Sequence, residues 1–214
     1  MSAPDRSGLA RAVPRVIRLL LASSNPGKLR EYRALAPQGA SSLAVELELL
    51  PRFSELPPFD ESAPTFAENA AGKALHYSRF AQEPVLADDS GLVVDALGGA
   101  PGVHSARYAG AHASDAQRVA KLLAELRASG ATGRRARFVC ILALAQRGRV
   151  VGLFSDAVEG EITDAPRGAS GFGYDPVFFI PALGKTFAEI PHEVKNVHSH
   201  RGKAYRKLLA FLAS

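Results

Sequence analysis

Short apolar runs alternate with helical repeats along this chain of 214 residues, and that alternation limits the folds open to it. Residues 16–22 read as a strand, and a helix then opens where Asn25 can cap and Pro26 takes the first helical position. Further apolar runs and helical repeats follow in turn as far as the C-terminus. Strands that alternate with helices in this way indicate an α/β protein.

Capping residues and a tight turn mark the later elements. Helices are expected to begin at Thr65, Ser114 and Ser199, the first two in capping-box pairs with an acid or amide three residues on. Two long runs, residues 136–145 and 150–159, are joined by Arg147-Gly148 and predict a β-hairpin. Residues 84–87 and 92–96 are expected to be strands, separated by a polar stretch.

Composition places few limits on function. The chain is 22% charged with a net charge of +5, and the basic residues are spread along it without interleaved aromatics. That balance suits a small polyanion such as a triphosphate better than a nucleic-acid surface. A lone cysteine, Cys140, reads as a small buried hydrophobe and suggests a reducing compartment, so a cytoplasmic protein is expected.

The N-terminal segment has no clear targeting function. Its apolar run, residues 17–21, is broken by Arg18 and makes a poor signal peptide. No run approaches the ~20 apolar residues needed to cross a bilayer. We therefore expect residues 1–15 to be a disordered extension and residues 16–214 to form one domain.

Two adjacent aspartates, Asp88 and Asp89, stand where the apolar run of residues 84–87 meets Ser90-Gly91. Neighbouring side chains of a strand point to opposite faces, so the two carboxylates cannot face water in the same way. One of them is expected to be half-buried at the end of the strand, where it would suit a metal ligand or a general base. Such a cluster beside a cleft fits a Mg²⁺–phosphate site. A turn held by Asx-type hydrogen bonds is the alternative.

The segment Ser23-Ser24-Asn25-Pro26-Gly27-Lys28 leads from a strand into a helix N-terminus, where free N–H groups and the helix dipole favour phosphate. Cations are mildly unfavourable at that end, so an anionic ligand would explain Lys28. The segment is not a Walker A loop, because Ala22 stands where the first glycine is required and Leu29 follows the lysine. A plain helix start with a solvated lysine is the alternative.

A second candidate segment, Gly171-Phe172-Gly173-Tyr174-Asp175-Pro176, places an aromatic ring between two glycines. Glycine lets the backbone approach a ligand closely, and Phe172 would offer a stacking platform for a base. A hairpin turn with a packed aromatic is the alternative. Near the C-terminus, Lys195 and Arg201 read as donors to phosphate or to a base carbonyl. Asn69 and Lys73 share a helix face that could point into a cleft, although a solvated face is the default expectation.

These pieces occur in a set order: Ser-Asn-Pro-Gly-Lys, Thr-Phe-Ala-Glu-Asn-Ala, Ala-Asp-Asp-Ser-Gly-Leu, Gly-Gly-Ala-Pro-Gly-Val-His-Ser-Ala-Arg-Tyr, Gly-Phe-Gly-Tyr-Asp-Pro and Ser-His-Arg-Gly. The order resembles that of the non-standard purine nucleoside triphosphate pyrophosphatases, the inosine triphosphatase (HAM1-like) family, over residues 16–212. The resemblance implies a mixed, strongly twisted sheet with flanking helices that form two lobes around a central cleft.

The resemblance also assigns roles by position. The triphosphate would lie on Ser23, Ser24, Asn25, Pro26, Gly27 and Lys28, with Asn25 and Lys28 in direct contact. Glu61 and Asp89 would bind metal with support from Asp88, and Asp89 would also be the general base. Ser90 would touch substrate, and Phe172, Gly173, Tyr174 and Asp175 would hold the base. Lys195, His200 and Arg201 would contact substrate, the last two near the 6-keto edge of the purine. Pro64 departs from the family pattern, in which a glycine often precedes the threonine.

The implied reaction is Mg²⁺-dependent hydrolysis between the α- and β-phosphates of ITP, dITP or XTP, which yields the monophosphate and pyrophosphate and cleanses the nucleotide pool. Asp89 would deprotonate the attacking water, while Lys28 and Lys195 would add fixed positive charge. A 6-amino purine would leave buried polar groups unpaired. The resemblance further implies a homodimer that engages neither nucleic acid nor membrane.

Three other interpretations stay open. A Maf-like pyrophosphatase would act on other nucleotides, although the Gly-Phe-Gly-Tyr-Asp and Ser-His-Arg blocks match the purine family. A nucleotide-binding module without catalysis would be expected to lack the Asp88-Asp89 pair or Lys28. A nucleic-acid-binding protein is favoured only by the net charge, and it predicts binding that depends strongly on salt.

Overall fold

Seven strands form one mixed sheet in the computed structural model, which describes residues 15–35 and 43–214. Within those residues the strands are β1 (Arg15–Leu21), β2 (Leu43–Leu49), β3 (Val85–Val94), β4 (Arg135–Gln146), β5 (Arg149–Ile162), β6 (Phe178–Ile180) and β7 (Lys185–Thr186). Their order across the sheet is β2-β1-β3-β4-β5-β6-β7. β1 is parallel to β2 and β3, whereas the later pairs are antiparallel.

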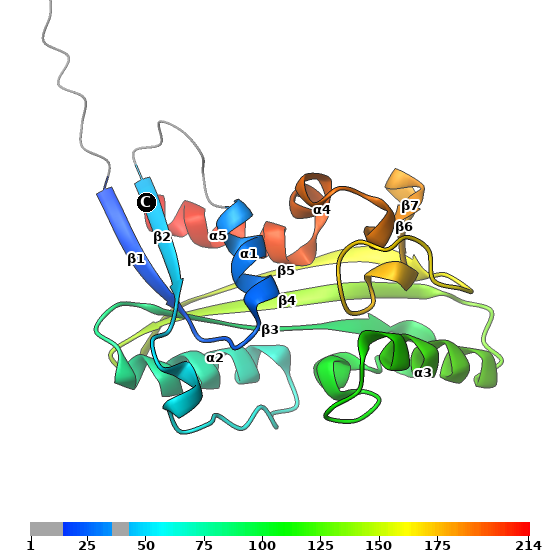
Figure 1. Cartoon of the computed structure of the whole chain (residues 1–214), viewed down its shortest axis with the longest axis horizontal. Coiled ribbons are helices and arrows are strands. Elements are labelled where there is room, and N and C mark those ends of the chain that lie inside the picture. The colour runs from blue at the N-terminus through cyan, green and yellow to red at the C-terminus, as the bar shows by residue number, and fades with distance from the viewer. Residues whose placement is uncertain (1–14, 36–42) are drawn as a thin grey trace, which may run out of the picture.

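Helices cover both faces of this sheet. They are α1 (Pro26–Leu35), α2 (Phe66–Tyr77), α3 (Asp115–Ala128), α4 (His192–His198) and α5 (His200–Ala213). Short 3₁₀ turns are η1 (Phe53–Glu55), η2 (Ser78–Phe80), η3 (Asp95–Leu97), η4 (Gly102–Arg107), η5 (Asp175–Val177), η6 (Pro181–Leu183) and η7 (Phe187–Glu189). In Figure 1, α1, α4 and α5 lie above the sheet, and α2 and α3 lie below it.

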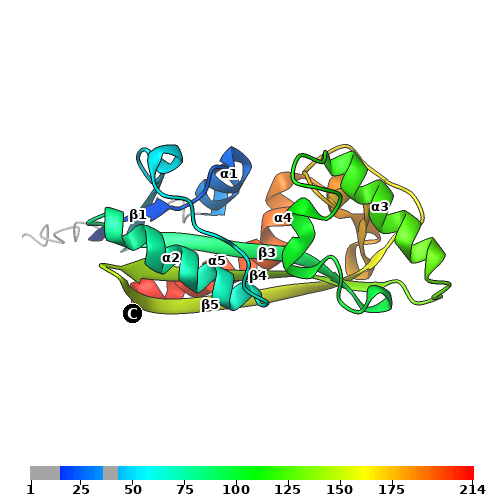
Figure 2. The ribbon, with the colours of Figure 1, turned by 90° about the horizontal axis from the view of Figure 1, so that it is seen from below.

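Two lobes are built on the long strands β3, β4 and β5, which run through the whole molecule (Figures 1 and 2). One lobe adds β1, β2, α1 and α2, and the other adds α3, β6 and β7. The buried apolar side chains follow the same division. One cluster lies between the sheet and α1 with α5, a second between the sheet and α2, and a third joins α3 to β6. The expected two-lobed α/β fold is therefore confirmed.

Local signals in the sequence gave the helix starts correctly. The Asn25 side-chain oxygen accepts a hydrogen bond from the Gly27 N–H at 2.8 Å, and α1 begins at the next residue after the cap. The hydroxyls of Thr65, Ser114 and Ser199 each accept from the backbone N–H three residues on. The expected hairpin is formed by β4 and β5, whose connecting residues both have the positive φ that a type I′ turn requires.

The expectation that a strand ends at the two aspartates was wrong. β3 continues without a break from Val85 to Val94, and Asp88 and Asp89 pair in register with Leu142 and Ile141 of β4. The Asx-turn alternative is therefore wrong as well, because backbone pairing on β4 holds this stretch extended. Sequence reasoning also missed β2 and α4.

Three expectations about the chain ends and environment can be compared with the structure. The expected N-terminal extension, residues 1–15, lies outside the described residues except for Arg15, which opens β1. Cys140 is fully buried on β4, as expected, and burial raises the pKa of its thiol to about 11. In the part of the chain that the structure describes, no helix is both long and apolar enough to span a bilayer.

Candidate active site

A cavity of about 690 Å³ lies between the two lobes. Its walls come from α1, β3, β4, η4, α3, the segment before η5, α4 and α5. The sequence-predicted residues that line it are Asn25, Gly27, Lys28, Ser90, Phe172, Gly173, Tyr174, Asp175, Lys195, His200 and Arg201. The structure thus brings two segments that are far apart in the sequence to one cavity: residues 23–28, predicted to bind phosphate, and residues 171–176, predicted to bind the base (the base segment).

The other sequence-predicted residues lie behind or beside this cavity. Ser23 is buried and its hydroxyl accepts from the Asn25 N–H at 3.1 Å, so it shapes the turn that precedes α1. Ser24 is exposed and does not line the cavity, and Pro26 opens α1. Glu61, Asp88 and Asp89 do not line it either.

Asp88 is 1% exposed and is compensated by cations. The Lys28 Nζ lies 2.9 Å from its carboxylate, and the Arg201 Nε lies 3.9 Å from its Oδ2. Burial alone would raise the pKa of this carboxyl, but the charges of Lys28, Arg201 and Lys73 outweigh burial and hold the pKa well below its usual range. Asp88 is therefore a fixed negative charge at working pH, and it supplies an anion for the unusual lysine at the start of α1.

Asp89 is 8% exposed and lacks such compensation. Its Oδ2 is buried without a hydrogen-bond partner in the described chain. The pKa of this carboxyl is raised to about 6, chiefly by burial, with Glu61 and Asp88 contributing to the rise and Asn69 and Lys28 opposing it. A carboxylate with a pKa near neutrality and an unused oxygen can take up a proton under physiological conditions.

Glu61 meets Lys73, a residue of α2. The Lys73 Nζ lies 2.5 Å from the Glu61 Oε1, and Asn69 holds the same loop through both hydrogen bonds of its side chain to the Ala63 backbone. The pKa of Lys73 is raised, because Asp88, Glu61 and Asp89 together outweigh its burial. Asn69 and Lys73 are both buried, so the expected solvated face of this helix was wrong.

The acids expected to bind metal are not arranged as a preformed metal cluster. Within residues 15–35 and 43–214, no three His, Cys, Asp or Glu side chains form a group that could hold a metal ion. Glu61 and Asp88 are instead each paired with a lysine.

A chain of buried ion pairs connects the two lobes across the cavity. Arg201 pairs with Glu31 of α1, Glu31 accepts from the Lys195 Nζ at 3.1 Å, and Lys195 reaches the Asp175 Oδ2 at 2.6 Å. The charges of Arg201 and Lys195 hold the pKa of Glu31 below its usual range despite its burial. Sequence reasoning missed Glu31, although its place three residues after Lys28 put both side chains on one helix face.

Aromatic rings form the middle of the cavity. Phe172 is 37% exposed, and the Lys195 Nζ lies 4.8 Å from the centre of its ring. Phe138, which sequence reasoning did not select, stacks on His200 with ring centres 4.8 Å apart and an angle of 10°. Burial and the neighbouring cations hold the pKa of His200 well below its usual value, so its imidazole is neutral. A flat ligand can therefore meet aromatic surface on more than one side.

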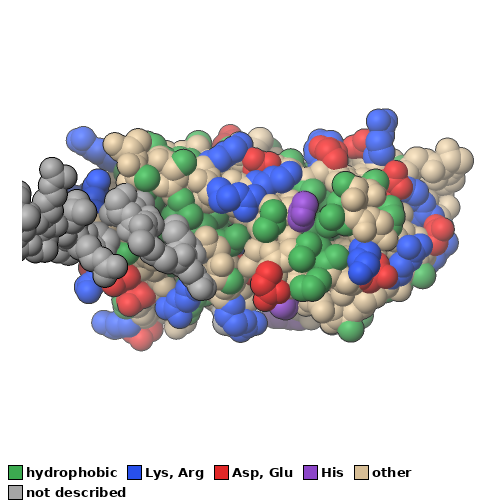
Figure 3. All heavy atoms as spheres, turned by 90° about the horizontal axis from the view of Figure 1, so that it is seen from above, with side chains coloured by type: hydrophobic (Ala, Val, Ile, Leu, Met, Phe, Trp, Pro, Cys, Tyr) green, Lys and Arg blue, Asp and Glu red, His purple; other side chains and the backbone are tan. Residues whose placement is uncertain are grey.

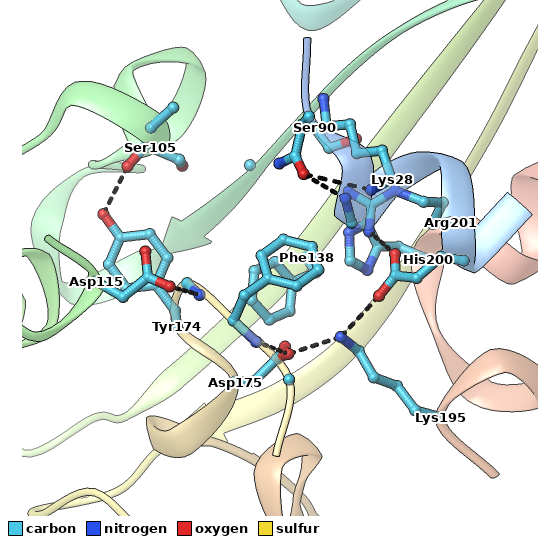
Figure 4. A pocket seen from close by; sticks show the side chains of 18 of the residues that line it. Lys28, Ser90, Ser105, Asp115, Phe138, Tyr174, Asp175, Lys195, His200 and Arg201 are labelled. Carbon is cyan, nitrogen blue, oxygen red and sulfur yellow. Dashed lines mark hydrogen bonds and ion pairs between the residues drawn. The ribbon is translucent and has the colours of Figure 1, made fainter. Parts of the chain in front are cut away.

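Figure 4 shows that the cavity has two unlike ends. Lys28, Lys195, His200 and Arg201 lie on one side of Phe138, and Ser105, Asp115 and Tyr174 lie on the other. The first side, which we call the cation end (Lys28, Lys195 and Arg201), suits phosphate or carbonyl oxygen. On the outer face drawn in Figure 3, basic side chains are mixed with acidic and apolar ones, without one continuous basic stripe.

The sequence and the fold are both similar to those of known proteins. The profile of the Ham1 family matches residues 19–211. A dITP/XTP pyrophosphatase from Geobacillus kaustophilus is 52% identical over 191 residues, which are 89% of this chain and 91% of that protein. A dITP/XTP pyrophosphatase from Thermus thermophilus is 47% identical over 195 residues, 91% of each chain.

Two solved structures share the fold. A HAM1 protein from Coxiella burnetii has a TM-score of 0.81 at 40% identity, over 92% of this chain and 98% of that one. The Ham1 protein of Staphylococcus aureus has a TM-score of 0.79 at 38% identity, over 91% and 97% of the two chains. The matches cover both lobes and the cavity between them.

Proposed function

The chain belongs to the Ham1 family, and we propose that it hydrolyses non-standard purine nucleoside triphosphates, dITP and XTP among them, to the monophosphate and pyrophosphate. The pyrophosphatase activity is that of relatives that match nine-tenths of its length. The observation that carries the proposal is the single cavity that joins a cation-rich end to aromatic rings, with an uncompensated buried carboxylate beside it.

The Lys28 side of the cation end would hold the triphosphate. The N–H groups of Gly27 and Lys28 at the N-terminus of α1 donate to the Asn25 side-chain oxygen, and Lys28 itself lines the cavity beside this cap. Such a helix start favours phosphate groups. Lys73 would add a further cation near the phosphates, since it already lies among Asp88, Glu61 and Asp89. These charges are fixed before the substrate arrives and would stabilise the charge of the leaving pyrophosphate.

Asp89 would be the general base. Its free Oδ2 would accept a proton from a water molecule while the water oxygen bonds to the α-phosphorus. The bond between the α-phosphorus and the bridging oxygen breaks at the same time, and pyrophosphate leaves with that oxygen. A pKa near 6 leaves Asp89 mostly ionised at neutral pH but still basic enough to accept the proton.

Magnesium fits the acids at this place in the fold. Glu61 is close enough to Asp89 to raise the pKa of its carboxyl, and carboxylate oxygens are the protein ligands that Mg²⁺ prefers. Glu61 and Asp89 would hold the ion, with Asp88 as a nearby charge. When bound, Mg²⁺ would neutralise charge on the phosphate oxygens during transfer.

The base would lie against the aromatic rings. Phe172 would stack on it, and Gly173, Tyr174 and Asp175 would shape the pocket around it. Lys195 and Arg201 are donors, and together with His200 they would meet the 6-keto oxygen. Asp88, Glu31 and Asp175 hold these two cations in place, so a 6-amino group would meet a fixed donor and leave it unpaired.

Oligomeric state and compartment belong to the proposal as well. Exposed apolar side chains occur on β5 next to the β4–β5 turn, namely Val150, Val151 and Leu153. We propose that this surface pairs with a second copy to give a homodimer in the cytoplasm, a reducing compartment that suits the free cysteine. Sedimentation should report a dimer that Leu153→Glu converts to a monomer, and an unchanged dimer in this variant would contradict the proposed surface.

A substrate panel tests the function. Pyrophosphate release is measured with Mg²⁺ from dITP, XTP and ITP, and from ATP, GTP and TTP as comparison substrates. Fast release from the first three, with little from the others, is expected. Preferential hydrolysis of TTP would favour the Maf-like alternative, and binding without any hydrolysis would leave a nucleotide-binding module.

A further inference from the structure

The turn that carries Phe172 is held at Gly173 by the side chain of Asp115, a residue that belongs to none of the sequence motifs. The N–H of Gly173 donates to the Asp115 Oδ2 at 2.6 Å, and Asp115 is the first residue of α3. Phe172, the exposed ring expected to stack on the base, directly precedes Gly173. The contact therefore lies one residue from the platform, on the side of the cavity away from the cation end (Figure 4).

Gly173 has open space where a side chain would lie. A Cβ built on this glycine would meet nothing within 4 Å, and its φ of +63° is in the left-handed region. Phe172 is likewise partly exposed, with a cation rather than an apolar wall over its ring. The hydrogen bond from the Gly173 N–H to Asp115 is therefore a direct contact that holds this side of the turn, next to the Tyr174–Ser105 hydrogen bond.

Asp115 is itself held rigidly. Its other carboxylate oxygen pairs with Arg118, one turn along α3, and Arg118 donates to the backbone carbonyl oxygens of Ala106 and Ala113. The neighbouring Ser105 carbonyl accepts from the Tyr174 hydroxyl at 2.9 Å. Ser105, Asp115, Arg118 and Tyr174 form a connected set, which we call the clasp, between η4, α3 and the base segment.

The clasp is also part of the cavity wall. Ser105, Asp115, Arg118 and Tyr174 all line the cavity. By contrast, the Asp175 side of the same turn is tied to Lys195 and to the Phe172 N–H. The platform therefore has two supports, one from the cation end through Asp175 and one from α3 through Asp115.

We infer that Asp115 is a positioning residue, which holds the Phe172–Gly173 turn in the shape that binds the purine base and thereby sets base affinity. It acts through the Gly173 N–H and not on the reacting phosphates. This inference rests on the proposed function for the identity of the base, but the contact itself can be tested by ligand binding alone.

The test uses two probes on the full-length protein. Inosine monophosphate carries the base, and inorganic tripolyphosphate carries only the phosphate chain. Calorimetry is run on wild type, Asp115→Ala and the control Asp164→Ala, which removes an exposed acid outside the cavity. Amide hydrogen exchange of a peptide spanning residues 170–176 is measured on the same proteins, and thermal unfolding checks that each variant folds.

In Asp115→Ala, the Kd for inosine monophosphate should rise about tenfold, the effect expected of one charge-assisted hydrogen bond in a partly exposed place. The Kd for tripolyphosphate should change by less than about twofold, and exchange in residues 170–176 should quicken. With a hydrolysed triphosphate, the KM should rise while kcat is nearly kept. Asp164→Ala should behave as wild type in every assay.

Three results would overturn the inference. Equal weakening of both probes would indicate a general structural defect. Unchanged binding of inosine monophosphate would mean that the contact does not set base affinity. Weaker nucleotide binding without faster exchange in residues 170–176 would mean that Asp115 contacts the ligand directly. A wild-type protein that binds inosine monophosphate but hydrolyses no triphosphate would refute the proposed function and leave the test of Asp115 intact.

Discussion

On the α1–α5 side of β3, the Asp88 carboxylate meets Lys28 and Arg201, whereas on the α2 side the Asp89 carboxylate keeps one oxygen without a hydrogen-bond partner in the described chain. The two residues are adjacent on the central strand β3, both pair with β4, and both are buried. Their pKa values nevertheless move in opposite directions, Asp88 down and Asp89 up to about 6. Burial acts on both, so the difference comes from the cations that each face supplies.

The comparison distinguishes a carboxylate that stabilises the fold, Asp88, from one that is proposed to take part in the reaction, Asp89. A compensated carboxylate stays ionised and holds Lys28 and Arg201 in place. An uncompensated carboxylate costs free energy in the empty protein but retains an oxygen that can bind a proton or a cation. The α1–α5 face therefore arranges the cations proposed to bind substrate, and the α2 face holds the group proposed to do the chemistry.

The largest expected effect on stability is that of Asp88→Asn. The substitution removes the carboxylate that pairs with Lys28 and the buried Arg201. The free energy of unfolding at pH 7 should therefore fall by about 3 kcal/mol. Because the folded-state pKa of Asp88 is depressed, its contribution is present above pH ~4 and is lost as pH falls further. Urea unfolding at pH 7 and pH 3 measures both effects. If Asp88→Asn were as stable as wild type at pH 7, the claim that Asp88 stabilises the fold through its ion pairs would be wrong.

Asp89→Asn should have the opposite sign. Without metal, its free energy of unfolding at pH 8 should exceed that of wild type by about 2 kcal/mol, because a buried charge without an ion-pair partner in the described chain is removed. The folded-state pKa is raised, so the wild-type protein loses stability as pH rises from ~4 to ~6, and the gain of the variant should appear over that window. The same urea experiment checks it, and a loss of stability at pH 8 would contradict the account.

Glu31→Gln tests the ion-pair chain behind the cations. Lys195 and Arg201 share this carboxylate, and its loss should lower the free energy of unfolding by about 1.5 to 2 kcal/mol. The KM for dITP should rise more than kcat falls, since both cations are expected to contact the base. The matched control is Glu46→Gln, which breaks an exposed ion pair with Arg18 and should change stability little.

The smallest expected effect is that of magnesium on the empty protein. At about ten times its Kd, Mg²⁺ should add about 1.4 kcal/mol of stability above pH 7. The effect should fade below pH ~6, because protons then compete with Mg²⁺ for the Asp89 carboxylate. It should also be absent from Asp89→Asn. Thermal unfolding with and without Mg²⁺ measures it, and equal stabilisation of wild type and variant would place the ion elsewhere.

Local features of the fold could be read from the sequence because their causes are local. The caps at Thr65 and Ser114 and the Arg147-Gly148 turn depend on a few neighbouring residues. The strand β2 was missed, although Val45, Leu47 and Leu49 alternate with glutamates and are a local signal for a strand. The continuation of β3 through two aspartates was not, because the cations that make Asp88 tolerable come from α1 and α5.

The site was predictable only where a motif named its residues. Motif positions identified Lys28, Phe172 and Arg201, which the structure brings to one cavity. Lys73 and Glu31 escaped because their importance lies in partners that only the folded chain brings near. Asp115 looked like an ordinary first residue of a helix, and its contact with Gly173 joins segments that are distant in the sequence.

The most direct test of the account compares catalysis by the two aspartate variants. Pyrophosphate release from saturating dITP is measured at pH 8 with Mg²⁺ for wild type, Asp88→Asn and Asp89→Asn, under conditions where each remains folded. The account predicts that Asp89→Asn loses about a thousandfold in kcat, the contribution of a general base, although it is the more stable of the two variants. A kcat for Asp89→Asn within tenfold of wild type would contradict the assignment of the base to the uncompensated face.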